Sequence, residues 1–419
     1  MSSTDARRTS GRGWPPRVPR PRAADALEAF SAEEVASCVA YAKPRQRWGL
    51  VAFAVDGLLL AALALSGPGR RVVGWFAGLA GGFEPGRAAL AVTLMVLAQA
   101  LVSLPFSLRA FGQDRRAGLA TQRPRRFLFD WAKARGIGLV LTVLPVGALI
   151  LAARYRPIGY PWSAAAVGAL LVVVLTMLGP VVLEPLFNRF VPLGPGPLRE
   201  RVLRMAAEMR VPVRDVLVSD ASRRTTRVNA YVSGIGATRR VVVYDTLLRP
   251  GSQEPVPVER EDEVALVLAH ELAHVAHRDV LWGTVAGALL TGGGVLAVNW
   301  LLGFGWLQDL LRVRGLGDPL VAPGLLLLGA LGDLFASPLA SVVSRWAEAR
   351  ADWTALEVSR DPGTAVAVER RLALENRADL RPNRVLVAVF ASHPPTMARI
   401  AQARLWAERY QGPSRVPAG

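Results

Sequence analysis

The stretch DEVALVLAHELAHVAHRD, residues 262–279, contains three of the four histidines of this 419-residue chain. Its first turn is acidic, its next residues are apolar, and neither Pro nor Gly interrupts it, which predicts a helix that continues through His277. Residues four positions apart lie on the same face of a helix, so His270 and His274 face the same way. Two imidazoles in this arrangement can bind one metal ion, and Glu271 lies beside them within reach of a water molecule.

The spacing His-Glu-x-x-His is typical of the zinc site of metallopeptidases. The alternative is a chance placement of histidines on an ordinary helix, since the pattern fixes only three residues. The uninterrupted helix around the pattern favours a metal site that holds one Zn²⁺ per chain.

A catalytic zinc usually has three protein ligands, and two residues compete for the third place. His277 lies near the face of His270, but three ligands along one straight helix spread too far along its axis, which favours a supporting or surface role. Glu348 lies on a second predicted helix, 344–355, with Asp352 four residues further on. A ligand carboxylate next to a carboxylate that orients His270 would explain this pair. The alternative is a solvated acidic helix between arginines.

The composition predicts a membrane protein, because 52% of the residues are hydrophobic and only 20% are charged. The apolar residues are concentrated in runs close to the ~20 residues that cross a bilayer. We expect six spans, at residues 48–66, 88–108, 136–153, 162–183, 281–304 and 320–341. The sixth contains Asp333 and Pro338, which favours a kinked or partly re-entrant span, with a buried core helix as the alternative.

The residues before the first span form an arm rich in Arg, Pro and Ser, and we expect residues 1–40 to be disordered. No cleavable signal peptide precedes the first apolar run, which is therefore expected to be a membrane anchor. The single cysteine, Cys38, excludes an internal disulfide and gives no support to thiol catalysis.

The net charge of +17 raises the question of a nucleic-acid partner, which we exclude because the basic residues are not organised on a nucleic-acid-binding module. They follow membrane topology instead. The loop 109–135 has eight basic residues against Asp114 and Asp130. The positive-inside rule then places the N-terminus, this loop, the region 184–280 and the C-terminus in the cytoplasm.

Two polar regions flank the last two spans. In the first, residues 197–209 have helical spacing, and 215–219, 228–234 and 240–244 are short strands by their β-branched content. A small sheet before the metal helix suits a peptidase, because a sheet edge can hold an extended peptide by strand addition.

We therefore predict a mainly α-helical polytopic membrane protein with about six transmembrane helices and a cytoplasmic, zincin-like α/β domain. Its segments are the arm (1–40), four spans (41–183), the sheet and metal helix (184–280), two spans (281–341) and a C-terminal catalytic segment (342–419).

A set of patches in this order resembles the integral-membrane zinc metalloproteases of family M48, and in particular the Ste24-type CAAX prenyl proteases. The resemblance extends over roughly residues 30–405. The patches are Phe187-Asn188-Arg189-Phe190, Asn229-Ala230-Tyr231, Tyr244-Asp245-Thr246-Leu247-Leu248, His270-Glu271-Leu272-Ala273-His274, Glu348-Ala349-Arg350-Ala351-Asp352, and His393-Pro394-Pro395 followed by Arg399-Ile400.

The resemblance implies Glu348 as the third zinc ligand and Asn229, Ala230 and Tyr231 as the segment that binds substrate backbone. It also implies that His393 stabilises the transition state and that Arg399 helps to hold the site, whereas the alternative for His393 is a packing or capping role before Pro394. Glu271 is then the general base.

One departure concerns the membrane region, because the eukaryotic Ste24 enzymes typically have seven spans and this chain has six apolar runs. The resemblance implies a peptide or protein substrate, and prenylated CAAX proteins in particular. The composition is typical of a bacterial chain, which favours a bacterial plasma membrane and makes an HtpX-like role in degrading misfolded membrane proteins the alternative.

Two further alternatives are an inactive membrane scaffold with a structural zinc and a transporter-like helix bundle. The second is weakened by the scarcity of polar residues in the spans, where Asp56, Gln99 and Asp333 are the main ones.

Overall fold

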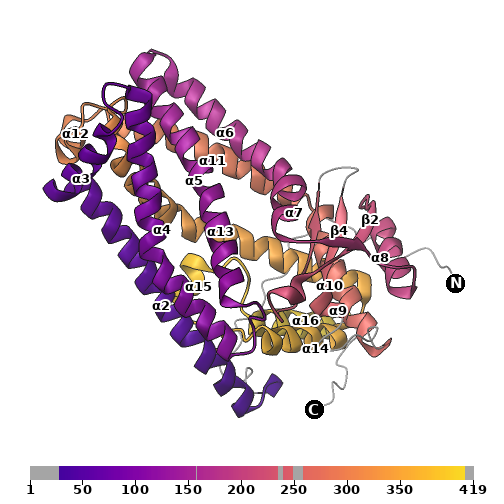
Figure 1. Ribbon diagram of the computed structural model, residues 1–419. Coiled ribbons are helices and arrows are strands. Elements are labelled where there is room, and N and C mark those ends of the chain that lie inside the picture. Colours follow the sequence, from indigo (N-terminus) through magenta and orange to yellow (C-terminus); the bar gives the residue numbers. More distant parts are fainter. Residues whose placement is uncertain (1–27, 157, 235–238, 249–257, 411–419) are drawn as a thin grey trace.

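The computed structural model describes residues 28–156, 158–234, 239–248 and 258–410. A bundle of long helices makes up one part of the molecule, and a smaller α/β part lies at one end of this bundle (Figure 1). The chain enters the α/β part twice, between the fourth and fifth long helices and again after the sixth.

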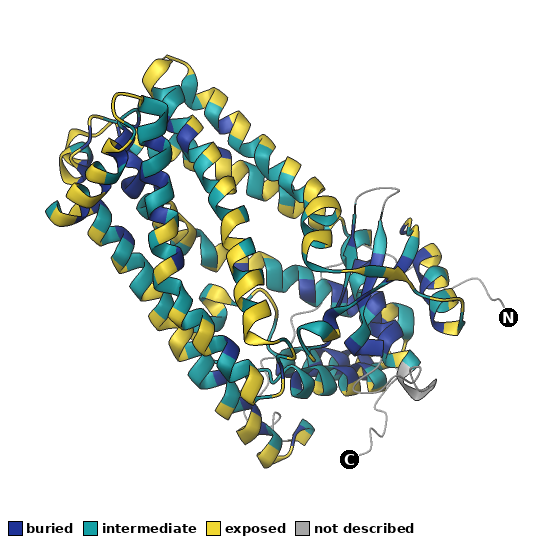
Figure 2. Cartoon of the chain, in the orientation of Figure 1, coloured by how far each residue is buried: buried dark blue, intermediate teal, exposed yellow. Residues whose placement is uncertain are grey.

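Six helical segments are long and apolar enough to cross a membrane, which confirms the six predicted spans. They are α2 (Ala32–Leu65), α4 (Glu84–Arg116), α5 (Pro124–Tyr155), the segment Tyr160–Phe187 with α6 (Tyr160–Leu178) and α7 (Glu184–Phe187), α11 (Asp279–Leu301), and the segment Pro319–Ser359 with α13 (Ala322–Ser359). Figure 2 shows exposed residues along these helices, whereas many of the buried residues lie in the α/β part. Large apolar side chains such as Leu101 and Leu289 are 71% exposed, as is expected of a surface that faces lipid. The protein is therefore an integral membrane protein.

The first helix begins earlier than predicted, so residues 32–40 of the expected disordered arm are helical. A capping box explains this start: the Ser31 hydroxyl accepts from the Glu34 backbone N–H, and the Glu34 carboxylate accepts from the Ser31 N–H. The rest of the predicted arm up to residue 27 lies outside the described residues. A helix of 34 residues is about 51 Å long, well beyond the ~30 Å bilayer core, so its first turns project from the membrane.

The sixth span is not re-entrant, because α13 continues without interruption past Pro338 to Ser359. The predicted span 320–341 and the predicted helix 344–355 are thus one element. Its exposed side chains, among them Phe335 at 81% and Leu339 at 68%, exclude a buried core helix. A transmembrane helix therefore carries Glu348 directly into the α/β part.

The α/β part contains a four-stranded sheet in the order β1-β2-β4-β3. Its strands are β1 (Phe190–Pro192), β2 (Asp215–Ser219), β3 (Ala230–Ser233) and β4 (Arg240–Tyr244), of which only β2 and β4 are parallel neighbours. The three predicted strands are present, while β1 was not predicted. Strand β3 lies at an edge of the sheet, and on its outer side the described residues contain no neighbouring strand.

The remaining helices of this region pack on the sheet, on α10 or on α13. They include α8 (Pro197–Glu208), α9 (Asp245–Leu248), α10 (Val258–Ala276), α14 (Pro362–Glu375), α15 (Arg384–Phe390) and α16 (Thr396–Tyr410). Two short helices, α3 (Gly67–Gly78) and α12 (Gly305–Leu311), pack together at the far end of the bundle.

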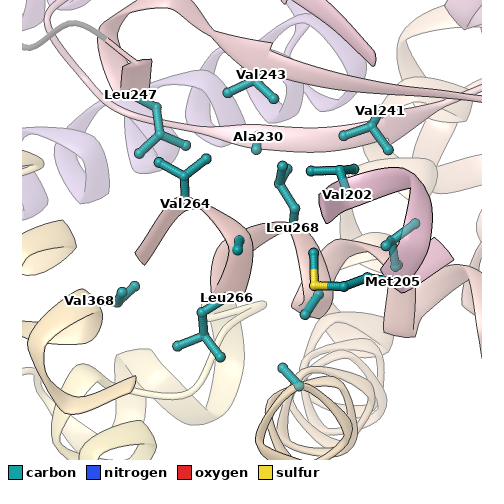
Figure 3. Packing of buried hydrophobic residues seen from close by; sticks show 14 of the residues in the cluster. Val202, Met205, Ala230, Val241, Val243, Leu247, Val264, Leu266, Leu268 and Val368 are labelled. Carbon is teal, nitrogen blue, oxygen red and sulfur yellow. The ribbon is translucent and has the colours of Figure 1, made fainter. Parts of the chain in front are cut away.

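The core of the α/β part lies between the sheet and α10. Figure 3 shows Val264 and Leu268 of α10 pointing toward the strands that carry Ala230, Val241 and Val243. Leu268, Val241 and Val243 are fully buried. This packing fixes the rotation of α10 about its axis, and with it the direction in which the other side of the helix points.

The basic loop between α4 and α5 docks onto the α/β part. Ala120 forms a β-bridge with Thr225, and the Thr121 N–H donates to the Arg224 carbonyl at 3.1 Å. The loop 109–135 and the α/β part therefore lie on the same side of the membrane, as the charge distribution predicted.

Leu268→Ala should lower the stability of the α/β part by about 2–5 kcal/mol, because it leaves a cavity between α10 and the sheet. Leu289→Ala, on the lipid-facing surface of α11, is the matched control and should have little effect. Thermal unfolding of the detergent-purified protein measures both. Equal shifts in the two variants would contradict the packing described here.

Candidate metal centre and active site

Two helices bring three ligand groups to one point. His270 and His274 come from α10 and Glu348 from α13, and one ligand atom of each lies within 4.8 Å of the other two. Both polar regions, before and after the last two spans, therefore contribute residues to one cluster. His277 is not part of this cluster.

Each histidine ring is oriented by a carboxylate at Nδ1. The Nδ1 of His270 lies 2.8 Å from Oδ1 of Asp352, and the Nδ1 of His274 lies 2.8 Å from Oδ2 of Asp279. A proton on each Nδ1 leaves the lone pair on each Nε2. The His274–Asp279 contact has hydrogen-bond geometry, whereas Nδ1 of His270 meets Asp352 as a close ion-pair contact. The two Nε2 atoms are 3.1 Å apart, so both lone pairs point into the same small space.

The surroundings of this space suit a cation. The Oε2 atom of Glu348 lies 3.3 Å from Nε2 of His270, is buried, and has no hydrogen-bond partner of suitable geometry. Burial lowers the pKa of His270, but Asp352 and Glu348 outweigh this effect and raise the pKa to about 10. These carboxylates thus favour positive charge at this place, which a bound cation supplies when it replaces the Nε2 proton. Two imidazole lone pairs and a buried carboxylate oxygen match the N and O ligands that zinc prefers.

Asp279 is a site residue that the sequence analysis missed. It is the first residue of α11, where it pairs with His274 and also with Arg350 on α13. The signal was present in the opening stretch, because Asp279 follows His274 by five residues, but only the sharp turn between α10 and α11 brings the carboxylate back to the ring.

A buried ion-pair chain supports Asp352 from behind. Arg399 on α16 donates through Nε to Oδ2 of Asp352 at 2.8 Å, and its Nη1 lies 2.9 Å from Oε1 of Glu369 on α14. Burial raises the pKa of Glu369 to about 7 even though Arg399 opposes the shift. Glu369 was not predicted, and its sequence neighbourhood contains no signal for this role.

Glu271 lines the same cavity as His270 and Glu348. Burial raises the pKa of its carboxyl group above the usual range, although the neighbouring histidines oppose this shift. A carboxylate with a raised pKa is a better proton acceptor at neutral pH than an exposed one.

The two remaining histidines have different surroundings. His393, between α15 and α16, has a side chain that is 65% exposed, and its Nε2 lies 3.3 Å from Oε1 of Glu348. His277 lies away from the ligand cluster, with its Nε2 2.9 Å from the Thr354 hydroxyl on α13. His393 therefore borders the candidate metal centre, while His277 links α10 to α13.

Next to the ligands is a cavity of about 770 Å³. Asn229 and Ala230 at the start of β3 line it, together with apolar residues of α2 and α15 such as Phe53 and Leu386. The side chain of Tyr231 does not line this cavity, and its hydroxyl donates to the Glu184 carboxylate at 3.3 Å.

Strand β3 offers alternate backbone groups to its open side. Because the Tyr244 N–H donates to the Asn229 carbonyl at 3.0 Å, Asn229 and Tyr231 face β4. By the alternation of an antiparallel pair, Ala230 and Val232 direct their N–H and C=O groups away from β4. The sheet edge beside the ligands can therefore accept another extended chain.

Asp279→Asn should weaken zinc binding by about 10–100-fold, because a neutral amide oxygen accepts from Nδ1–H of His274 more weakly than the carboxylate does. Competition for zinc with a chelator measures this effect. Asp245→Asn is the matched control, since the Asp245 carboxylate accepts from the Ser222 N–H away from the ligands. Identical zinc affinity in Asp279→Asn and the unmodified protein would contradict the orienting role.

Two family models together match most of the chain. The model of peptidase family M48 matches residues 193–407, and a model described as CAAX prenyl protease N-terminal, five membrane helices, matches residues 17–189. The first match contains every ligand and carboxylate of the site described above.

Individual proteins agree with these matches. The uncharacterized metalloprotease YhfN of Bacillus subtilis is 26% identical and covers 91% of this chain and 88% of its own length. The CAAX prenyl protease 1 homolog of Arabidopsis thaliana is 30% identical and covers 72% of this chain and 69% of its own length. In fold, the chain is similar to the crystal structure of S. mikatae Ste24p, with a TM-score of 0.71, 19% identity and 89% of both chains covered. These matches exclude a transporter: the chain belongs to peptidase family M48, as a membrane metalloprotease of the Ste24 type.

Proposed function

We propose that this protein is a zinc metalloendopeptidase that cleaves extended protein segments at the membrane boundary. The observation that carries this proposal is the convergence of His270, His274 and Glu348 at one end of a cavity that Glu271 also lines. The Nε2 atoms of the histidines and the Glu348 carboxylate would hold one zinc ion, which when bound supplies the Lewis acidity that activates water.

Glu271 then performs the proton transfers. Its buried carboxylate takes a proton from the attacking water and returns it to the amine of the departing peptide. Asp352 and Asp279 keep the ligand rings in one tautomer, and Arg399 holds Asp352 in place.

His393 is placed to assist the same step. Its exposed ring is close to Glu348 at the mouth of the site, where an N–H can donate to the carbonyl oxygen as negative charge develops on it. The contacts of its ring with Ser392 and Glu348 favour this role over a packing role before Pro394.

The substrate would bind as an additional strand on the edge formed by Asn229–Val232, antiparallel to β3. Ala230 and Val232 provide the backbone groups that point away from β4, and the adjoining cavity accepts the side chains. The apolar residues that α2 and α15 contribute, Phe53, Leu386 and Phe390 among them, favour an apolar or lipidated segment near the cleaved bond.

The names of the relatives point to the CAAX class of substrates, and the match to the CAAX prenyl protease N-terminal region favours that class over an HtpX-like quality-control protease. We also propose a bacterial plasma-membrane location with the α/β part in the cytoplasm. The basic loop 109–135, which docks onto that part, supports this orientation through the positive-inside rule.

Glu271→Gln should leave zinc content unchanged and reduce peptide hydrolysis by about 10²–10⁴-fold, because the amide cannot accept the proton of the attacking water. Metal analysis and hydrolysis of casein or a labelled peptide measure the two quantities. Glu357→Gln is the matched control and should retain activity, because Glu357 is an exposed glutamate that accepts from the Trp353 indole N–H on α13.

Undiminished hydrolysis in Glu271→Gln would exclude the general-base role. If the unmodified protein binds zinc but cleaves no peptide, the inactive scaffold is the correct interpretation. If it is active, the Glu271→Gln variant can capture its substrates from a membrane extract, and a preference for lipidated proteins distinguishes CAAX processing from quality control.

A further inference from the structure

The side chain of Asn376 is paired with the backbone just before β3. Asn376 caps the carboxyl-terminal end of α14. Its Oδ1 accepts from the Val228 N–H at 3.2 Å, and its Nδ2 donates to the Val228 carbonyl at 3.3 Å. A side-chain amide bonded to both the N–H and the C=O of one residue reproduces the pairing that a neighbouring strand residue would make.

The backbone groups of Val228 that bond to Asn376 face the open edge of the sheet. Asn229 faces β4, so Val228 belongs to the same alternating set as Ala230 and Val232, whose backbone groups point to the open edge. Asn376 therefore occupies a place on the very edge along which a substrate would pair. Val228, Asn229 and Asn376 all line the cavity of the candidate active site.

We infer that Asn376 ends the substrate-binding edge and limits how far a peptide can extend on the carboxyl-terminal side of the cleaved bond. The inference rests on the proposed function, in which the peptide runs antiparallel to β3. Its carboxyl-terminal side then lies toward Val228. A peptide residue paired with Ala230 would place the residue two positions further on at Val228, where Asn376 already fills both hydrogen-bonding positions.

The surroundings hold Asn376 in this place. Its carbonyl accepts from Nη1 of Arg227 at 3.3 Å, and Nη2 of Arg227 donates to the Tyr41 hydroxyl on α2 at 2.6 Å. Three residues further on, the Asp379 carboxylate accepts from Lys43 and from Gln46, both at 2.9 Å. The projecting first turns of α2 thus fix the segment that closes this end of the edge, so a longer peptide does not displace it freely.

A length series of peptides tests the inference. The zinc-loaded, full-length protein is given peptides with a constant amino-terminal half and a carboxyl-terminal side lengthened one residue at a time. We expect kcat/KM to fall about tenfold once that side reaches Val228, because the added residue must either displace the two hydrogen bonds of Asn376 or leave its own backbone groups unpaired. Asn376→Ala frees Val228, so the fall should move to peptides that are longer by two residues.

Arg377→Ala is the matched control, because it breaks the neighbouring contact with Ser37 and leaves Val228 paired. It should keep the length dependence of the unmodified protein. If Asn376 only anchors α14 to the sheet, Asn376→Ala lowers the rate for all lengths equally, which overturns the inference. If Asn376→Ala does not fold, the length series on the unmodified protein tests the inference. Equal cleavage rates for long and short peptides would overturn the role of Asn376, while the proposed peptidase activity would stand.

Discussion

The packing of α10 between the sheet and α13 is the constraint on which the site depends. The apolar side of α10, with Val264 and Leu268, is buried against the strands, and this leaves His270 and His274 directed toward α13. Glu348 meets them there. A rotation of α10 by a fraction of a turn would separate the ligands, so the hydrophobic core of a small domain determines the geometry of the metal centre.

The membrane helices are part of the site as well as its anchor. Helix α13 passes from the bilayer into the α/β part and carries Glu348 and Asp352 on its extension. Helix α11 begins with Asp279, which orients His274, and then enters the membrane. The first turns of α2 pack against the segment after α14 through Lys43 and Asp379. The centre is thereby held at a fixed position relative to the membrane helices.

Buried charge is balanced throughout this region. Asp352 lies between His270 and Arg399, and Arg399 also pairs with Glu369. Removing one member of such a chain leaves an uncompensated charge in a low-dielectric interior, which costs far more than an exposed ion pair contributes. This series of ion pairs therefore connects α10, α13, α14 and α16, the four helices whose relative positions define the candidate active site.

The local sequence was sufficient to predict the membrane helices and the kind of side chains in the candidate metal site. The six apolar runs predicted the membrane helices because each must satisfy its backbone within the bilayer, and the spacing of His270 and His274 followed from the period of a helix. The start of α2 was misjudged, because the Ser31 capping box outweighs the polar composition that follows it.

Only the tertiary structure decided which distant residues meet. Asp279 and Glu369 reach the site through a turn between two helices and through the packing of α14 on α16. The pairing of Asn376 with Val228 joins positions 148 residues apart. No periodicity encodes such contacts, because they depend on where the whole chain places its surfaces. The sequence by itself thus determined a membrane protein with a zinc-type motif, and the fold decided that Glu348 lies beside both histidines, which carboxylates lie behind their rings, and that Asn376 pairs with the backbone before β3.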